Sequence, residues 1–178
     1  LTAIGLIAAF LTNVFCLAVA IFACIVSVSY TTAGKRSGLP GNLLVSTFGV
    51  IPFVYGNYVV ASTIDLKIVI FASMAFLSMA GREITKGIAD VEGDKVQNVR
   101  TLAVRFGEKN AAVAAAIFYL IAVSLSPIPW LLGLVSVFFI PLVATTDMGL
   151  LLSSLMLLKD HSRENARRVK KTVLFLLL

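Results

Sequence analysis

Two aspartates in the longest polar interval of the chain have the type and spacing to hold a divalent cation. Asp90 and Asp94 lie within residues 81–110, which carry five of the nine acidic side chains, and Glu92 stands between them. In a helix, a separation of four residues puts two side chains on one face, about one turn apart. Mg²⁺ prefers hard oxygen ligands and commonly combines one or two protein carboxylates with waters and substrate phosphate oxygens. The spacing therefore predicts half of a magnesium site with a diphosphate beside it.

Basic residues flank this pair and could bind phosphate oxygens that the metal leaves free. The same charges also fit a simpler interpretation, because a mixed-charge run between two apolar segments is usually a solvated loop. The setting favours a functional site, since carboxylates close to a bilayer are costly unless they are paired or coordinate a cation. The flanking basic residues are Arg82, Lys86, Lys95, Arg100 and Arg105.

The rest of the chain is composed for a lipid environment. Of its 178 residues, 59% are hydrophobic and only 13% are charged, and the mean hydropathy is +0.98. A soluble domain carries about 25% charged residues, so the composition indicates an integral membrane protein. The apolar runs lack the alternating polar face that a barrel needs, and only helices otherwise satisfy the backbone in lipid. We therefore predict an all-α, polytopic transmembrane helical bundle that forms a single domain over residues 1–178.

Six apolar stretches and the start of a seventh are expected to be spans, each needing ~20 residues to cross a bilayer. The first begins at residue 1 without Met, a basic segment or a cleavage site, which argues against a signal peptide. We expect the domain to be truncated at the N-terminus and at the C-terminus. The predicted spans are residues 1–12, 14–33, 43–61, 66–80, 111–126 and 131–158, with the seventh beginning at 172–178.

The positive charges predict the topology. The net charge is +6, and all but one of the fifteen Lys and Arg residues fall in three clusters that occupy every second connection. This is the positive-inside pattern, which predicts a multi-pass protein of the cell membrane with these loops on the cytoplasmic side, and no nucleic-acid partner. The clusters are Lys35 and Arg36, the basic residues within 82–109, and those within 159–171; Lys67 lies outside them.

One acidic residue lies inside a predicted span. Asp147 is intramembrane by position, so it is either functional or paired with a neighbouring helix. Thr145 and Thr146 beside it favour local hydrogen bonding, and Asp147 and Pro141 are expected to break or tilt this long apolar stretch.

The polar interval resembles a known family. The segment ADVEGDKVQNVRTLAVRFG, residues 89–107, is similar to the second aspartate-rich motif of the UbiA superfamily of intramembrane prenyltransferases, including its trailing T-L-x-x-x-x-G. Tyr30, followed by a basic turn, resembles the YxxxK region of that family. The resemblance covers the whole chain, and the segments GREITKGIADVEGD and KRSGLPGN are most similar to an archaeal branch.

The resemblance implies an enzyme with nine helices around a cavity that opens to lipid. It implies Mg²⁺-dependent transfer of a prenyl group from a prenyl diphosphate to a lipid-like acceptor. In the archaeal branch, a geranylgeranyl group passes from geranylgeranyl diphosphate to geranylgeranylglyceryl phosphate during ether-lipid synthesis. The implied residues are Asp90, Asp94 and Tyr30 for catalysis, both aspartates as metal ligands, and Lys35, Arg36, Lys95 and Arg100 for the diphosphate.

The chain departs from the family pattern in three ways. The first motif, NxxxDxxxD, and the two helices that precede these spans are absent. Gly34 stands where the YxxxK lysine would fall, so either Lys35 or Arg36 takes that role. Gly87 and Ala89 replace acidic residues that are often found upstream in the second motif.

Three other functions remain open. One is a nonenzymatic membrane scaffold, for which calorimetry would detect no binding of diphosphate or Mg²⁺. A related enzyme could prenylate an aromatic ring for quinone or tocopherol-type products, since ADVEGDK is similar in those enzymes. A membrane transporter would instead have ionisable groups near the middle of its spans, where only Asp147 qualifies. Assays with the two acceptors and flux measurements in liposomes distinguish these possibilities.

Overall fold

The structure, a computed structural model, describes residues 1–177, apart from the side chain of Lys35. Helices and turns make up this described part, so the prediction of an all-α fold is confirmed. The elements are α1 (Thr2–Thr12), α2 (Val14–Thr32), the 3-10 helix η1 (Gly34–Arg36), α3 (Leu39–Val60), α4 (Leu66–Ala89), α5 (Val91–Val96), α6 (Leu102–Phe106), α7 (Glu108–Leu125), α8 (Ile128–Leu131), α9 (Phe139–Lys159) and α10 (Arg163–Leu176).

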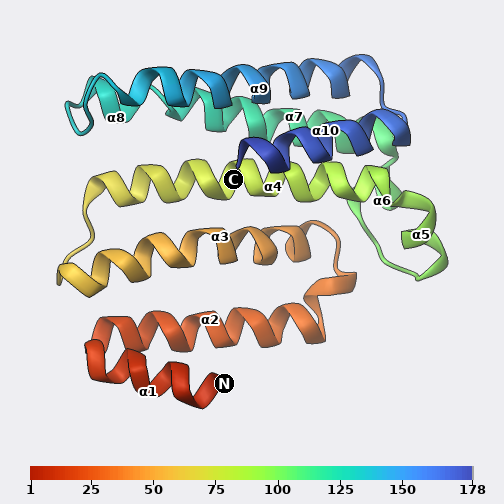
Figure 1. Cartoon of the computed structure of the whole chain (residues 1–178). Coiled ribbons are helices and arrows are strands. Elements are labelled where there is room, and N and C mark those ends of the chain that lie inside the picture. The colour runs from red at the N-terminus through yellow and green to blue at the C-terminus, as the bar shows by residue number, and fades with distance from the viewer. Residues whose placement is uncertain (178) are drawn as a thin grey trace.

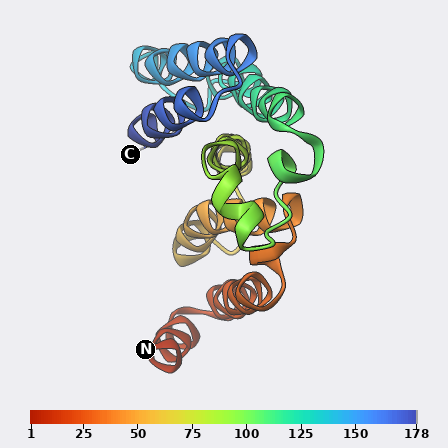
Figure 2. The same cartoon turned by 90° about the vertical axis from the view of Figure 1, so that its right-hand side faces the viewer.

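The long helices lie side by side in an order that follows the chain (Figure 1). Helix α2 packs on α3, α3 on α4, α4 on α7, and α7 on α9, while α10 folds back to contact both α9 and α4. Viewed along the helices, they form an open, curved row with α1 at one end and α9 near the other (Figure 2). The short helices α5 and α6 lie beyond the end of α4, on the same side of the molecule as the α2–α3 connection (Figure 1).

Five helical segments are long and apolar enough to cross a membrane, which confirms the predicted multi-pass bundle. They are α2, α3, α4, Glu108–Leu131 and α9, whereas the apolar helix α1 has only 11 residues. Of the predicted seventh stretch, residues 172–176 form the end of α10, Leu177 follows as a turn, and Leu178 lies outside the described residues. Large apolar side chains such as Phe22, Leu142 and Leu152 are half or more exposed on these helices, as lipid contact requires.

The structure corrects three predicted boundaries. Helix α4 continues to Ala89 rather than ending at residue 80, and α10 begins at Arg163 within a stretch that was predicted as a loop. The predicted span 131–158 starts late, because residues 132–138 form turns after α8. Pro141 lies in the first turn of α9, where a missing N–H costs little, so neither it nor Asp147 breaks the helix.

Close packing between α4 and α7 extends α4 beyond its apolar part. The α7 face that meets α4 is rich in buried alanines, which let the two helices approach closely. A Cβ on Gly81 would lie 2.6 Å from the Tyr119 ring, and the Tyr119 hydroxyl shares a 3.0 Å hydrogen bond with Thr85 Oγ1. These contacts bury small and polar residues of α4 after position 80. The helix therefore continues to Ala89, just before α5 begins.

Candidate active site at the charged end of the bundle

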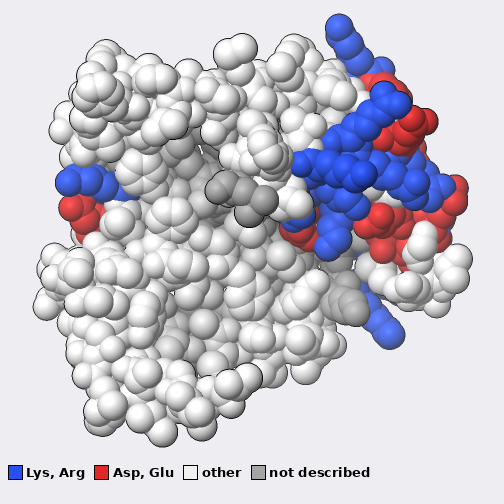
Figure 3. Space-filling model, viewed as in Figure 1, with Lys and Arg blue, Asp and Glu red and all other residues white. Residues whose placement is uncertain are grey.

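Charged side chains gather at one end of the molecule, beyond the ends of the apolar helices (Figure 3). This end carries the three basic clusters, because the α2–α3, α4–α7 and α9–α10 connections all lie there (Figure 1). At the opposite end of α4, Lys67 lies 4.0 Å from Asp65, and both side chains are about half exposed. The three connections with basic clusters therefore share one surface, as the charge pattern predicted.

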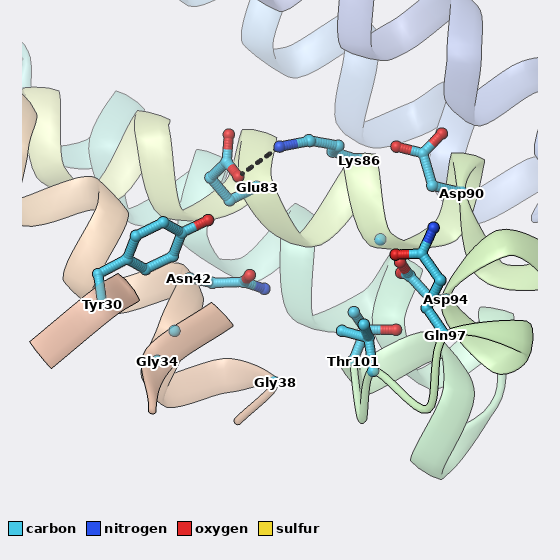
Figure 4. A pocket seen from close by; sticks show the side chains of 13 residues that line it. Tyr30, Gly34, Gly38, Asn42, Glu83, Lys86, Asp90, Asp94, Gln97 and Thr101 are labelled. Carbon is cyan, nitrogen blue, oxygen red and sulfur yellow. Dashed lines mark hydrogen bonds and ion pairs between the residues drawn. The ribbon is translucent and has the colours of Figure 1, made fainter. Parts of the chain in front are cut away.

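A polar pocket opens at this charged end. It lies between the end of α2, the η1–α3 turn, the last turns of α4, and the segment from α5 to Thr101. Tyr30 and Asn42 lie on one side of the pocket and Asp90 and Asp94 on the other, with Lys86 between them (Figure 4). The structure thus brings together the three residues that were predicted to be catalytic, from positions up to 64 residues apart.

Backbone contacts between two loops close the pocket. The Arg100 amide donates to the Arg36 carbonyl oxygen at 3.3 Å, which joins the segment before α6 to η1. Gly38 has φ +74°, and a Cβ there would lie 2.1 Å from the Arg100 carbonyl oxygen. A Cβ on Gly41 would lie 2.0 Å from the Gly34 carbonyl oxygen. Glycine is needed at both positions because backbone groups occupy the space of a side chain.

The two aspartates lie at the junction of α4 and α5. Asp90 directly follows α4, and its carbonyl oxygen accepts the Asp94 amide at 3.0 Å, so the two residues are one turn apart. Burial raises the pKa of the Asp94 carboxyl, and the Asp90 charge raises it further, while the Thr101 hydroxyl and Lys86 oppose this shift. Burial and the neighbouring charge disfavour the ionised form of this carboxyl, and a nearby cation would stabilise that form.

The donor set at this junction is small. Within the described residues, no group of three or more His, Cys, Asp or Glu side chains lies close enough together to hold a metal ion. Asp90 and Asp94 therefore offer two carboxylates and leave the other positions of a shell to waters and ligand oxygens. That is the ligand pattern with which proteins usually bind Mg²⁺, so the residues present fit this ion. Their role as metal ligands stays a prediction.

Glu83 is a pocket residue that the sequence analysis missed. It is only 7% exposed, and its two carboxylate oxygens pair with Arg82 at 2.9 Å and with Lys86 at 3.3 Å. A signal was present, since Glu83 is seven residues before Asp90 and a continuous helix places both on one face. The prediction that α4 ends at residue 80 hid this relationship.

Asn42 was also missed, and its state in the fold is informative. Its side-chain nitrogen is buried and has no hydrogen-bond partner among the described residues. The side chain points into the pocket from α3 (Figure 4). A buried amide donor without a partner is costly, so a ligand oxygen in the pocket would satisfy it. The residue type alone gives no signal of this, because the missing partner is a property of the fold.

Of the four residues predicted to bind a diphosphate, the three with described side chains lie around the pocket rather than within it, and the binding role of all four stays a prediction. Arg36, Lys95 and Arg100 are exposed, and Lys95 and Arg100 line a separate surface hollow. The side chain of Lys35 lies outside the described part of the structure. Among the described residues that line the pocket, the basic one is Lys86.

The hydrogen bonding of Asp147 corrects one prediction. Its carboxylate accepts a 2.5 Å hydrogen bond from the hydroxyl of Ser126, at the end of α7. Thr145 instead donates to the Pro141 carbonyl oxygen within its own helix. The prediction of local hydrogen bonding between Asp147 and the threonines was therefore wrong. The alternative, pairing with a neighbouring helix, is confirmed. The Ser126 contact lies at the α8 end of the bundle, away from the charged end.

Comparison with known proteins identifies relatives over the whole chain. A family model described as the UbiA prenyltransferase family matches residues 1–178. Digeranylgeranylglyceryl phosphate synthase of Archaeoglobus fulgidus is 43% identical over 145 residues, which are 79% of this chain and 49% of that protein. The synthase of the same name from Methanosarcina mazei is 30% identical over 178 residues, covering 100% of this chain and 62% of that protein. The chain thus spans 49% to 62% of the length of these two relatives.

Two solved structures share the fold. One, described as "Structural and mechanistic insights into the biosynthesis of Digeranylgeranylglyceryl phosphate synthase in membranes", superposes with a TM-score of 0.84 at 27% identity and covers 98% of this chain and 62% of that one. The apo structure of a UbiA homolog from Aeropyrum pernix K1 superposes with a TM-score of 0.76 at 17% identity, covering 98% and 66%. The second likeness concerns the fold alone.

Proposed function

The chain belongs to the UbiA prenyltransferase family, and from this membership we propose that the protein transfers a prenyl group from a prenyl diphosphate to a membrane-associated acceptor. The observation that carries the proposal is the polar pocket itself. Asp90, Asp94 and an amide donor that has no partner among the described residues line this pocket, at the charged end of a bundle that is otherwise apolar. These groups suit a substrate with an anionic head and an apolar tail.

Five polar side chains of the pocket have a role in this proposal. Asp90 and Asp94 hold Mg²⁺, which when bound supplies charge neutralisation to the diphosphate as it leaves. Lys86 and the Asn42 amide bind diphosphate oxygens that the metal leaves free. Their hydrogen bonds to these oxygens strengthen as negative charge develops on the leaving diphosphate. The Tyr30 hydroxyl points into the same pocket and donates to the leaving group.

The reaction needs little acid–base chemistry. The bond between the allylic carbon and the diphosphate oxygen breaks, and the electron pair leaves with the diphosphate. An acceptor hydroxyl oxygen attacks the carbon and loses its proton to the departing diphosphate. The chain's task is to hold the diphosphate and to keep water from the carbon. An apolar groove lies between α2, α3 and α4 and offers room for a prenyl tail. Two of these helices also carry pocket residues, Tyr30 on α2 and Glu83 on α4. The lining of this groove includes Phe22, Thr47, Val50, Val54, Phe76 and Leu77.

For the substrates, we propose geranylgeranyl diphosphate and geranylgeranylglyceryl phosphate, as in archaeal ether-lipid synthesis. The names of the relatives support this choice over an aromatic acceptor, because both are digeranylgeranylglyceryl phosphate synthases. The positive-inside rule supports a cytoplasmic location for the pocket, since the basic clusters surround it. A lipid diphosphate would then reach the site at the inner membrane surface.

A transfer assay on the purified protein tests this function. We expect Mg²⁺-dependent transfer to geranylgeranylglyceryl phosphate and much slower transfer to hydroxybenzoate or homogentisate. Asp90→Asn and Asp94→Asn should each lower turnover at least about a hundredfold, because a lost metal ligand costs several kcal/mol of transition-state stabilisation. Asp65→Asn, at the opposite end of α4, is the matched control and should leave turnover unchanged.

Three results would contradict the proposal. If both aspartate variants kept turnover within twofold of that of the natural protein, Asp90 and Asp94 would not be ligands of a catalytic metal. A preference for an aromatic acceptor would reassign the substrate, and ion flux in liposomes without prenyl transfer would favour a transporter.

A further inference from the structure

Helix α10 directs two basic side chains at the acidic junction of α4 and α5. Arg163 and Lys170 are seven residues apart, so they share one face of α10 about two turns from each other. Lys170 Nζ lies 3.7 Å from Asp90 Oδ2, and Arg163 Nη1 pairs with Glu92. Both pairs join residues more than 70 positions apart, so the fold and not local sequence creates them.

The packing of α10 fixes where these side chains emerge. Ala166, Val169 and Val173 are fully buried between α10, α4 and α9. At the start of the helix, the Asn165 side chain donates to the carbonyl oxygens of Met156 and Asp160 at 2.8 and 2.6 Å. The stem of Lys170 therefore leaves a rigid surface, and its side chain is only 25% exposed. Its ammonium is held close to Asp90 by the fold.

Asp90 needs such a partner because a second carboxylate lies one turn away. Two like charges at this distance repel each other and disfavour the shared orientation that a cation requires. Lys86, the nearest basic side chain of α4 in the pocket, pairs with Glu83 instead. Among the described residues, Lys170 is the one that forms an ion pair with Asp90. Because it engages Oδ2, the other carboxylate oxygen stays available to a metal.

We propose that Lys170 is a positioning residue that orients the Asp90 carboxylate for the divalent cation and its bound diphosphate. The inference rests on the proposed function, because it concerns the same site. It extends that site to α10, and Lys170 lies 80 positions after Asp90 in the sequence. An ion pair that is partly exposed contributes little to folding stability. The contribution of Lys170 therefore appears in metal and diphosphate binding rather than in unfolding.

Three variants of the full-length protein test this role: Lys170→Met, Lys170→Arg and, as the matched control, Lys171→Met. Lys171 is exposed, one residue further along α10, and forms no ion pair among the described residues. The measurements are the Mg²⁺ concentration for half-maximal transfer, the calorimetric affinity for magnesium pyrophosphate, and the thermal unfolding midpoint.

We expect Lys170→Met to raise the half-maximal Mg²⁺ concentration and to weaken pyrophosphate binding roughly tenfold, the usual cost of losing a residue that orients a metal ligand. Lys170→Arg should restore most of both, while Lys171→Met should match the natural protein. The unfolding midpoints of all variants should agree. If Lys170→Met does not fold, Lys170→Gln replaces it with the same criteria.

The inference is overturned if the Lys170 and Lys171 variants show the same Mg²⁺ dependence and the same pyrophosphate affinity within twofold. It is also overturned if Lys170→Arg fails to rescue binding. These outcomes leave the proposed function standing, since that depends on Asp90→Asn and Asp94→Asn. The pyrophosphate measurement remains informative even if no prenyl transfer is found, so the two failures are distinguishable.

Discussion

Arg100 donates its backbone amide to the carbonyl oxygen of Arg36, and this contact joins two loops that are 64 residues apart in sequence. Both residues were predicted to bind a diphosphate through their guanidinium groups, which stays a prediction, and both side chains are exposed. Their backbones also shape the pocket, because the joined loops form the wall opposite α4. The close approach depends on Gly38, which lies between η1 and α3.

Gly38→Ala should therefore destabilise the protein and impair the pocket. The residue has φ +74°, and an added Cβ would lie 2.1 Å from the Arg100 carbonyl oxygen. A strained φ alone costs about 1–3 kcal/mol, so we expect a loss of at least about 2 kcal/mol in unfolding free energy, measured by denaturation in detergent. Gly56→Ala in α3, where nothing lies within 4 Å of the new Cβ, is the control. Equal stability of the two variants would refute the loop argument.

Composition and the lengths of the apolar runs were sufficient to predict an all-helical membrane protein, because lipid restricts the possible folds so strongly. They were not sufficient to place the end of α4. Gly81, Glu83 and Thr85 are small or polar, and hydropathy therefore predicted that the span had ended. Their burial comes from α7 and α10, which lie elsewhere in the sequence.

The candidate active site was also predictable only in part, because some of its contacts join segments that are distant in the sequence. The turn shared by Asp90 and Asp94 follows from a separation of four residues, and spacing alone revealed it. Lys170 was recognised only as part of a basic cluster, because nothing in the sequence places α10 beside α4. The unpaired amide of Asn42 depends on which neighbours the fold provides. Contacts between distant segments therefore complete a site whose first two residues the sequence reveals.

The Asn42 amide provides a test of where the diphosphate binds. Asn42→Ala removes a donor that has no partner among the described residues, so folding should change little while the KM for the prenyl diphosphate rises. A hydrogen bond to a charged group contributes about 1.5–3 kcal/mol, which corresponds to a rise of roughly ten- to a hundredfold. Asn42→Asp should be worse, because it places a like charge beside the phosphate oxygens. Steady-state kinetics measure both effects.

Ser46→Ala is the matched control for this position. Ser46 lies one turn further along α3, is buried, and donates its hydroxyl to the Asn42 carbonyl oxygen. Its side chain does not line the polar pocket. An unchanged KM in Asn42→Ala, or an equal rise in Ser46→Ala, would show that the amide does not bind the substrate.

Substitutions of Glu83 and Lys86 should have different effects, although the two side chains pair with each other. The Glu83 variant should lose stability, and the Lys86 variant should bind the prenyl diphosphate more weakly. Glu83 is buried and holds two basic side chains, so Glu83→Gln should lower the unfolding free energy by about 1–3 kcal/mol. This is less than the cost of breaking a fully buried pair, because Lys86 is nearly half exposed. Lys86→Met should change stability by less than about 1 kcal/mol but raise the KM for the prenyl diphosphate. Denaturation curves and kinetics measured on both variants check this contrast.

The reverse pattern would contradict these roles. If Lys86→Met destabilised the protein as much as Glu83→Gln and left the KM unchanged, the lysine would be a structural partner of Glu83 and no ligand of the diphosphate. Glu92→Gln is a useful comparison, since Glu92 is an exposed acidic residue of the same region that pairs with α10 rather than with Lys86. It should leave both the stability and the KM close to those of the natural protein.

Asp147 offers the last test, because an intramembrane carboxylate is usually functional whereas its contact here is structural. Its carboxylate accepts the Ser126 hydroxyl at 2.5 Å and ties α9 to the end of α7, far from the polar pocket. Asp147→Ala and Ser126→Ala should each lower the unfolding free energy by about 1–2 kcal/mol, and the double variant should lose less than the sum. Prenyl transfer per folded molecule should stay within twofold. Additive losses would deny the pairing, and a large loss of turnover without loss of stability would place Asp147 in the reaction or on a transport path.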